Sequence, residues 1–309
     1  MTYRWMPLAA ALAITACGQT TDTPPAEDTD VAALAVEAKT TMDTNGETTT
    51  SLTAVLDAQS DEHKARYAAR NPAETLAFFG IEPGMTVVEA LPGGGWYSKI
   101  LAPYLGRDGK LIGTDYSMDM WPLFGMWSDE QIEQRRSWTA TFIEGAQEWR
   151  GDDGALIDAF VFGNMDERFN GTADAVLMIR ALHNLNRFES DGGFRTTALD
   201  NAFTALKPGG VLGVVQHRAP ADNDDDWADG SNGYLKQQAL IDAITAAGFE
   251  FVEASEINAN DADQPTNEEF VWRLPPSLAT SGDDDALRAE MLAVGESDRM
   301  TLKFIKPAS

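Results

Sequence analysis

The fold is decided by residues 87–97, which read Val87-Val88-Glu89-Ala90-Leu91-Pro92-Gly93-Gly94-Gly95-Trp96-Tyr97. The apolar start of this stretch predicts a buried strand, and the glycines after its carboxylate predict a turn whose backbone can lie close to a ligand. Residues 97–105 are compatible with a helix, so the loop lies between a strand and a helix N-terminus. Because open α/β sheets bind nucleotide-like ligands at such loops, the stretch predicts a ligand site.

A second carboxylate, Asp115, stands at the end of the next apolar run, residues 110–114. Its spacing from the glycine loop suits an acid that accepts hydrogen bonds from ribose hydroxyls. The loop and this acid together predict an adenosine-containing cofactor.

The rest of the chain alternates between predicted strands and helices. Strands are predicted at residues 86–89, 110–114, 159–162, 173–179, 211–216, 249–254 and 301–305. Helices are predicted at residues 61–79, 97–105, 196–206 and 234–247. Pro72 either breaks the first of these helices or begins another. This alternation predicts an α/β domain with a mostly parallel sheet and helices on both faces.

The ordered motifs resemble those of class I S-adenosylmethionine-dependent methyltransferases. The resemblance rests on residues 89–95, Asp115, the strand that begins near Asp174, and the turn Leu206-Lys207-Pro208-Gly209-Gly210. It implies a Rossmann-like doubly wound sheet of about seven strands, with an antiparallel last strand.

A narrower resemblance covers most of the domain. The loop at residues 92–97, Arg180 with His183-Asn184, and Gly295-Glu296-Ser297-Asp298-Arg299-Met300 are similar to a poorly characterised group of bacterial predicted methyltransferases. Both resemblances imply methyl transfer from S-adenosyl-L-methionine. An aromatic-rich site would suit a small or apolar acceptor better than a nucleic acid, so we expect a small-molecule acceptor.

The resemblance assigns cofactor-binding roles to seven residues: Glu89, Gly93, Gly94, Gly95, Asp115, Asn164 and Met165. Glu89 would lie near the methionine moiety, the glycines would let the backbone approach, and Asp115 would hold the ribose. Asn164 and Met165 would flank the adenine. Two positions depart from the family pattern, because Leu91 replaces a usual glycine and Asn164 stands where an acid is common.

Methyl transfer depends on positioning and on exclusion of water, with a base only where the nucleophile carries a proton. The catalytic candidates are His183 and Tyr97, and the substrate-binding candidates are Arg180, Asn184, His217 and Arg218. All lie in loops expected at the carboxyl ends of strands. The competing interpretation is that His183 and His217 are structural histidines.

Residues 1–17 predict a lipoprotein-type signal peptide. The apolar segment from Trp5 to Ile14 is too short to cross a bilayer, and Ile14-Thr15-Ala16-Cys17 resembles a lipobox, in which the cysteine is lipidated. The alternatives are a generic secretory signal or a misplaced start. We expect a lipid anchor at Cys17 in the cell envelope, facing the periplasm. Because Gly18 is not aspartate, we expect the outer membrane.

The composition of the rest of the chain indicates a tether followed by a folded domain. Residues 18–55 are acidic and rich in Thr and Pro, which predicts a disordered tether. Residues 56–309 form the methyltransferase-like domain, with an insertion at about 255–299 that we expect to cap a substrate pocket. Trp272 lies in this insertion, and packing of the insertion onto the domain is the alternative role for such tryptophans.

The net charge and the cysteine content exclude some partners and some kinds of site. The formal net charge is −26, with 49 acidic and 23 basic residues, which argues against a nucleic-acid partner. The single cysteine excludes a disulfide within the chain and a cysteine-ligated zinc site, and we expect no metal.

Two other functions remain open. One is an exported, non-catalytic ligand-binding lipoprotein that retains the fold, which an export signal favours because S-adenosylmethionine is made in the cytoplasm. The other is an NAD(P)-dependent oxidoreductase, since Gly93, Gly95 and Asp115 nearly match a dinucleotide fingerprint. Ser98 at the third glycine position argues against the oxidoreductase. The sequence does not indicate an oligomeric state.

Overall fold

The computed structural model describes residues 51–308. The predicted signal peptide, Cys17 and most of the predicted tether lie outside the described residues. Helix α1, Leu52–Asp57, overlaps the end of the predicted tether and buries Val55 and Leu56 against the domain. Within residues 51–308, no helix combines the length and apolar character that a membrane span needs.

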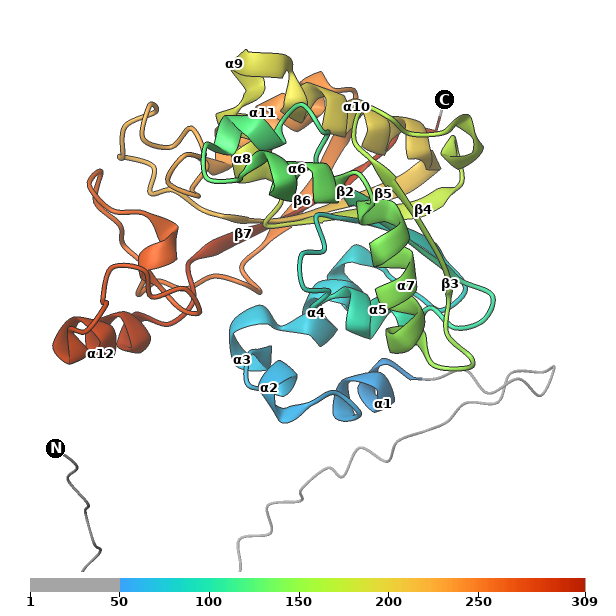
Figure 1. The fold of residues 1–309 in the computed structure, drawn as a ribbon, viewed down its shortest axis with the longest axis horizontal. Coiled ribbons are helices and arrows are strands. Elements are labelled where there is room, and N and C mark those ends of the chain that lie inside the picture. The colour runs from blue at the N-terminus through green and yellow to red at the C-terminus, as the bar shows by residue number, and fades with distance from the viewer. Residues whose placement is uncertain (1–50, 309) are drawn as a thin grey trace, which may run out of the picture. The chain divides into compact units, whose positions relative to one another are not determined.

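The centre of the domain is one sheet of seven strands (Figure 1). These are β1 (Thr86–Ala90), β2 (Lys110–Asp115), β3 (Leu156–Val161), β4 (Ala173–Ile179), β5 (Leu206–His217), β6 (Glu250–Ser255) and β7 (Arg299–Ile305). Their order is β3-β2-β1-β4-β5-β7-β6. Strands β1 to β5 pair in parallel, and β7 is antiparallel to both β5 and β6. The predicted seven-stranded sheet with an antiparallel last strand is confirmed.

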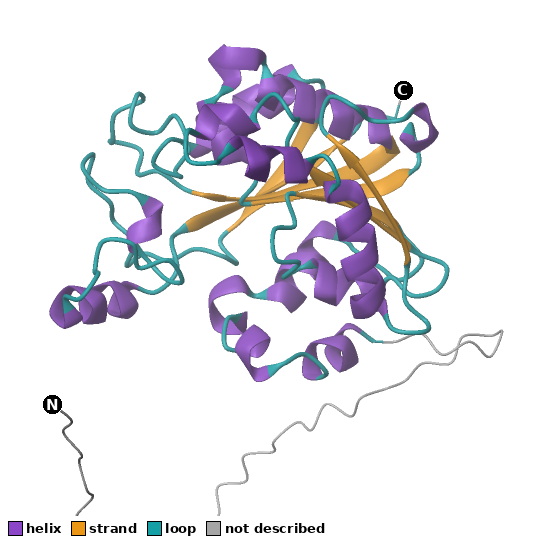
Figure 2. Ribbon diagram, in the orientation of Figure 1, coloured by secondary structure: helices purple, strands orange, loops and turns teal. Residues whose placement is uncertain are grey.

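Helices cover both faces of the sheet, as predicted (Figure 2). One face packs against α1, α4 (Pro72–Phe79), α5 (Ser98–Tyr104) and α7 (Trp138–Arg150), and the other against α8 (Leu182–Arg187), α10 (Phe194–Ala205) and α11 (Gln237–Ala246). Alternate strand residues enter the two cores: Val87 faces the first and Val88 the second. Each large apolar side chain buried in this way contributes roughly 1.5–3 kcal/mol.

The shorter elements lie in the connections. They are α2 (Asp61–Lys64), α3 (Tyr67–Arg70), η1 (Trp121–Phe124), α6 (Asp129–Arg135), η2 (Glu167–Phe169), α9 (Glu189–Gly192), η3 (Val271–Arg273) and α12 (Asp285–Val294). Three helices cover residues 61–79. Pro72 begins another helix, which confirms one of the two predicted alternatives, whereas the break between Lys64 and Tyr67 was not predicted. Asn71 adopts a left-handed φ of 39°, and Pro72 begins α4, where its missing N–H costs nothing.

Strand β5 begins earlier than predicted, at Leu206. The sequence Lys207-Pro208-Gly209-Gly210 is an excursion within the strand, where the pairing with β4 shifts register. Gly209 has a φ of 77°, and its N–H donates to the carbonyl oxygen of Lys306 at 2.8 Å. This bond connects the excursion to the residue that follows β7.

The strand order reverses direction between β1 and β4. From β1 the chain moves to β2 and then to β3 on one side, and it then returns to β4 on the other side of β1. The loops that leave the carboxyl ends of β1 and β4 therefore diverge, which opens a crevice at this switch point.

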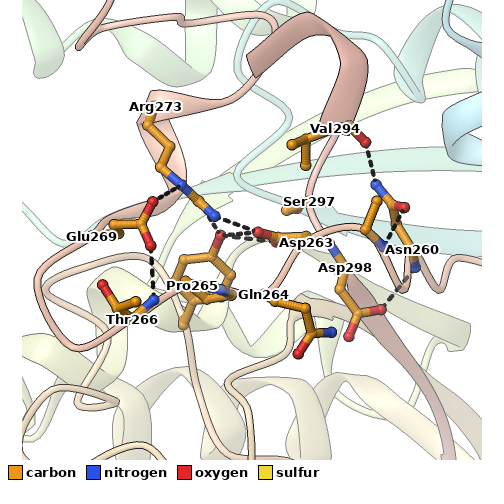
Figure 3. Close-up of polar contacts among 12 residues, drawn as sticks. Asn260, Asp263, Gln264, Pro265, Thr266, Glu269, Arg273, Val294, Ser297 and Asp298 are labelled. Atoms are coloured by element: carbon orange, nitrogen blue, oxygen red, sulfur yellow. Dashed lines mark hydrogen bonds and ion pairs between the residues drawn. The ribbon is translucent and has the colours of Figure 1, made fainter. Parts of the chain in front are cut away.

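The connection between β6 and β7 is held by its own polar contacts (Figure 3). Asp263 is 2% exposed and accepts hydrogen bonds from Arg273 Nη2 at 2.8 Å and from the N–H of Asp298 at 2.9 Å. Asn260 Nδ2 donates to the carbonyl oxygens of Val294 and Glu296. These contacts fix the segment that leads into β7.

Candidate functional site

A pocket of about 530 Å³ lies at the switch point. The residues that line it include Leu91, Gly93 and Gly94 after β1, Arg180 and His183 after β4, and His217 at the end of β5. The N-terminal helices contribute His63, Arg66 and Arg70, and the β6–β7 connection contributes Trp272. Segments distant in sequence thus meet where the topology predicts a ligand.

Both loops at the switch point contain a residue in a conformation that side chains rarely adopt. Leu91 has a φ of 53° and Arg180 a φ of 58°. Such residues cost of order 1–3 kcal/mol and concentrate at functional sites. Leu91 stands where the family that the sequence resembles usually has a glycine. Its left-handed φ gives a physical reason for that glycine, which adopts this conformation without strain.

Three arginines surround one carboxylate beneath the pocket. Glu296 accepts hydrogen bonds from Arg66 Nε at 2.6 Å and from Arg299 Nη2 at 2.8 Å, and Arg70 Nε lies 3.4 Å away. Burial lowers the pKa of Arg70 to about 9, and the neighbouring guanidinium of Arg180 adds to the shift. Positive charge is therefore concentrated here, and Glu296 offsets only part of it.

All three histidines of the chain line this one pocket. Burial lowers the pKa of His63 and of His183 to about 4, so both rings are neutral at pH 7. Burial and the nearby His183 also lower the pKa of His217, whose Nδ1 lies 2.6 Å from Ser297 Oγ. Each imidazole can accept or donate a hydrogen bond without carrying charge.

Trp96 forms one wall of the pocket. Its ring stacks on His63 with the ring centroids 4.4 Å apart, and the guanidinium of Arg70 lies 4.5 Å from the ring centroid of Trp96. A cation over an indole face is attracted by the ring electrons. Trp96 therefore holds both side chains against the pocket.

Five of the residues predicted from sequence line the pocket: Gly93, Gly94, Arg180, His183 and His217. They come from the ends of β1, β4 and β5, which the parallel sheet brings to one edge. An ideal Cβ placed on Gly94 would meet no atom within 4 Å, so the backbone is open to a ligand there.

Four predicted residues lie behind or beside the pocket and do not line it: Glu89, Gly95, Tyr97 and Asp115. Glu89 is 4% exposed and accepts a hydrogen bond from Ser98 Oγ at 2.5 Å, and burial raises its pKa to about 7. The Tyr97 hydroxyl donates to the carbonyl oxygen of Arg70 at 3.2 Å, which makes Tyr97 a support for Arg70. Gly95 faces Trp149, which an added Cβ would meet at 2.4 Å.

Asp115 stands at the end of β2 and is also absent from the pocket lining. Its Oδ1 accepts a hydrogen bond from the N–H of Tyr116 at 2.9 Å, and burial raises its pKa to about 6. Its second oxygen accepts no hydrogen bond from the described residues and can take one from a ligand.

The remaining predicted residues lie farther from the pocket. Asn164 is exposed in the turn after β3, and Met165 packs against the core. Asn184 Nδ2 donates to the Tyr116 hydroxyl at 3.0 Å. Arg218 pairs with Glu256 and Asp298 beside a second hollow of about 460 Å³. None of these four lines the pocket at the switch point.

Sequence reasoning missed several lining residues, including His63, Arg66, Arg70, Trp96 and Lys99. A signal was present for two of them, because Arg66 and Arg70 are four residues apart in a chain with 49 acidic and 23 basic residues. Among the described residues, no cluster of three or more His, Cys, Asp or Glu is placed to hold a metal ion.

Comparisons with known proteins give weak matches. No family model and no curated protein matches the chain. Its structure is similar to that of the [4+2]-cyclase SpnF, with 17% identity over 78% of this chain and 81% of that chain and a TM-score of 0.46. A SAM-dependent methyltransferase from Aquifex aeolicus is also similar in structure, with 13% identity and a TM-score of 0.45. The match covers 83% of this chain and 99% of that chain.

A 1,6-didemethyltoxoflavin-N1-methyltransferase from Burkholderia thailandensis, with bound 1,6-didemethyltoxoflavin and S-adenosylhomocysteine, is 13% identical over 80% of this chain and 81% of that chain. Its TM-score is 0.42. Values at this level assign no activity to this chain.

Proposed function

We propose that this protein transfers a methyl group from S-adenosylmethionine to a small-molecule acceptor. The observation that carries the proposal is the pocket at the switch point, where the glycine loop after β1 meets the end of β4. In doubly wound sheets a crevice at this place is where nucleotide-like ligands bind.

The residues present fit the cofactor in two places. Gly93 and Gly94 leave backbone open at the pocket, where the methionine end would lie. Asp115, at the end of β2 and outside the pocket lining, keeps one carboxylate oxygen available for a ribose hydroxyl. When bound, S-adenosylmethionine supplies an electrophilic methyl carbon on a sulfonium sulfur.

The chain would contribute position and a dry pocket. Trp96 and Trp272 supply aromatic walls that exclude water, and Arg180 orients the acceptor. His183 is neutral at pH 7 and would accept a proton from an acceptor that carries one. With a lowered pKa it is a weak base, which favours acceptors that ionise readily.

The proposal is tested by calorimetric titration of the full chain with S-adenosylmethionine, S-adenosylhomocysteine and NAD. Micromolar binding of the two adenosyl ligands without NAD binding is the expected result. Binding of NAD alone would support the oxidoreductase. The absence of binding by all three would support a non-catalytic ligand-binding protein.

Replacement of Gly94 by Leu is expected to weaken S-adenosylhomocysteine binding by at least about tenfold, equivalent to ~1.4 kcal/mol. The added side chain meets no protein atom at its Cβ and occupies space that the ligand needs. Calorimetry gives the affinity, and thermal unfolding should show little change in Tm.

Gly145→Leu is the matched control, because this glycine lies in helix α7 and its added Cβ meets only Trp149, at 3.8 Å. It should bind the ligand as the wild type does. Equal affinities for Gly94→Leu and the wild type would remove the glycine loop from the site.

We also propose that the mature chain is a lipoprotein of the cell envelope, anchored through Cys17 and facing the periplasm from the outer membrane. Support comes from the lipobox-like sequence at residues 14–17. An enzyme at this location would need its cofactor supplied from the cytoplasm.

Cys17→Ser is expected to abolish acylation, leaving the protein unprocessed or soluble, because a serine cannot form the thioether-linked lipid. Fractionation after labelling with a radioactive fatty acid measures this. Incorporation of label into the Cys17→Ser variant would contradict the anchor.

A further inference from the structure

The pocket at the switch point is basic although the protein is strongly acidic. The formal net charge of the chain is −26, yet the pocket lining carries four basic side chains and one carboxylate. The basic residues are Arg66, Arg70, Lys99 and Arg180, and the acid is Glu62. Behind them, Glu296 is matched by Arg299. This concentration of positive charge attracts anions to the pocket.

The same lining holds hydrogen-bond donors that have no acceptor. Among the described residues, the Arg180 side chain makes no hydrogen bond or ion pair. Two further donors, Arg70 Nη1 and Trp96 Nε1, are buried without a partner among the described residues. Arginine and tryptophan nitrogens only donate. Because the Arg180 guanidinium carries five N–H donors and has no acceptor among the described residues, the pocket offers unused donors to a ligand that carries acceptor atoms.

The cofactor does not meet this need. S-adenosylmethionine carries a sulfonium and an ammonium against one carboxylate, so its net charge is positive. Its carboxylate can satisfy one guanidinium, but the pocket retains an excess of positive charge. Two cationic partners in a partly buried site repel each other unless an anion lies between them.

We propose that the second ligand of this pocket is a small anion that carries a carboxylate or phosphate group. That this anion is the methyl acceptor rests on the function proposed above. Arg180 would bind its oxygens through charge-assisted hydrogen bonds, which guanidinium geometry allows in pairs, and the buried Arg70 behind it would add positive charge. Lys99 would add a point charge, and the pocket volume of about 530 Å³ suits a small molecule.

The chain provides its own reporters for a test, because all three histidines line the pocket. The full chain, labelled with ¹⁵N-histidine, is titrated with acetate, succinate and inorganic phosphate at constant ionic strength. Each titration is repeated in the presence of S-adenosylhomocysteine. Imidazole NMR signals report binding, and the anion with the lowest Kd identifies the preferred group.

Saturable shifts of the histidine signals are expected with at least one anion. Arg180→Gln should weaken this binding by at least about tenfold, and Lys99→Gln several-fold, because each removes a positive charge from the lining. Arg168→Gln is the matched control, since Arg168 is 56% exposed and pairs with Asp158 outside the pocket. It should bind as the wild type does.

The outcomes separate this inference from the proposed function. Absence of saturable shifts with every anion, or equal binding by Arg180→Gln, would overturn the anion site even if S-adenosylhomocysteine binds. Competition between the anion and S-adenosylhomocysteine would overturn the acceptor role and assign the arginines to the cofactor carboxylate. Anion binding without S-adenosylhomocysteine binding would confirm the anion site and overturn methyl transfer.

Discussion

Asp263→Ala is expected to lower the free energy of unfolding by about 3–4 kcal/mol. Asp263 is 2% exposed and accepts hydrogen bonds from Arg273, from the N–H of Asp298 and from the Tyr234 hydroxyl. Its removal leaves a buried guanidinium with only Glu269 as a charged partner, and breaking a buried pair typically costs 3–5 kcal/mol. Urea unfolding of both proteins measures the difference.

Two variants make this prediction specific. Asp261→Ala changes an exposed aspartate in the same connection and should alter stability by no more than about 0.5 kcal/mol. The double variant Asp263→Ala/Arg273→Met removes both charges and should be more stable than Asp263→Ala alone. A loss below about 1 kcal/mol in Asp263→Ala would show that solvent or Glu269 already compensates Arg273.

Glu89→Gln is expected to stabilise the protein by about 2–3 kcal/mol at pH 8 and by little near pH 4.5. Burial raises the pKa of Glu89 from 4.5 to about 7, so between these values the folded state holds a proton that the unfolded chain has released. Wild-type stability therefore falls as pH rises through this window. Glutamine carries no charge and still accepts the Ser98 hydrogen bond.

Unfolding of both proteins in urea at several pH values between 4.5 and 8 measures this effect. Burial lowers the pKa values of His63 and His183, so their contribution to the free energy of unfolding falls as the pH drops below 6.5. This contribution is the same in the wild type and in Glu89→Gln, and it cancels when the two stabilities are subtracted. Glu250→Gln, at an exposed position in β6, is the control. A stability difference that does not change with pH would contradict the assignment.

Local pattern was enough to predict most of the fold. The apolar runs at residues 86–89 and 173–179 are buried strands because they face a core on both sides, and such runs are distinctive. The break between Lys64 and Tyr67 was missed because no glycine or proline marks it in the sequence, whereas Pro72 marks the start of α4. Strand β5 was predicted too short because Pro208 and Gly209 ordinarily end a strand.

The candidate site was less predictable because charge partners meet only in three dimensions. Arg180 and His183 could be found from their position after a strand, where the fold places ligand contacts. Arg70 and Glu296 are 226 residues apart, and no periodicity links them. Asp115 was predicted from its spacing after the glycine loop and from the family resemblance, and neither says how far its side chain lies from the pocket.

The order of strands also has a consequence for biosynthesis. Strand β7 lies between β5 and β6 but follows both in the chain. A nascent chain that ends before residue 299 would leave the pairing edge of β5 open and β6 detached from the sheet. It would also lack Arg299 and the completed contacts of Glu296 beneath the pocket. Ligand binding should therefore appear only after β7 has paired with β5 and β6, which makes the pocket a marker of a completed sheet.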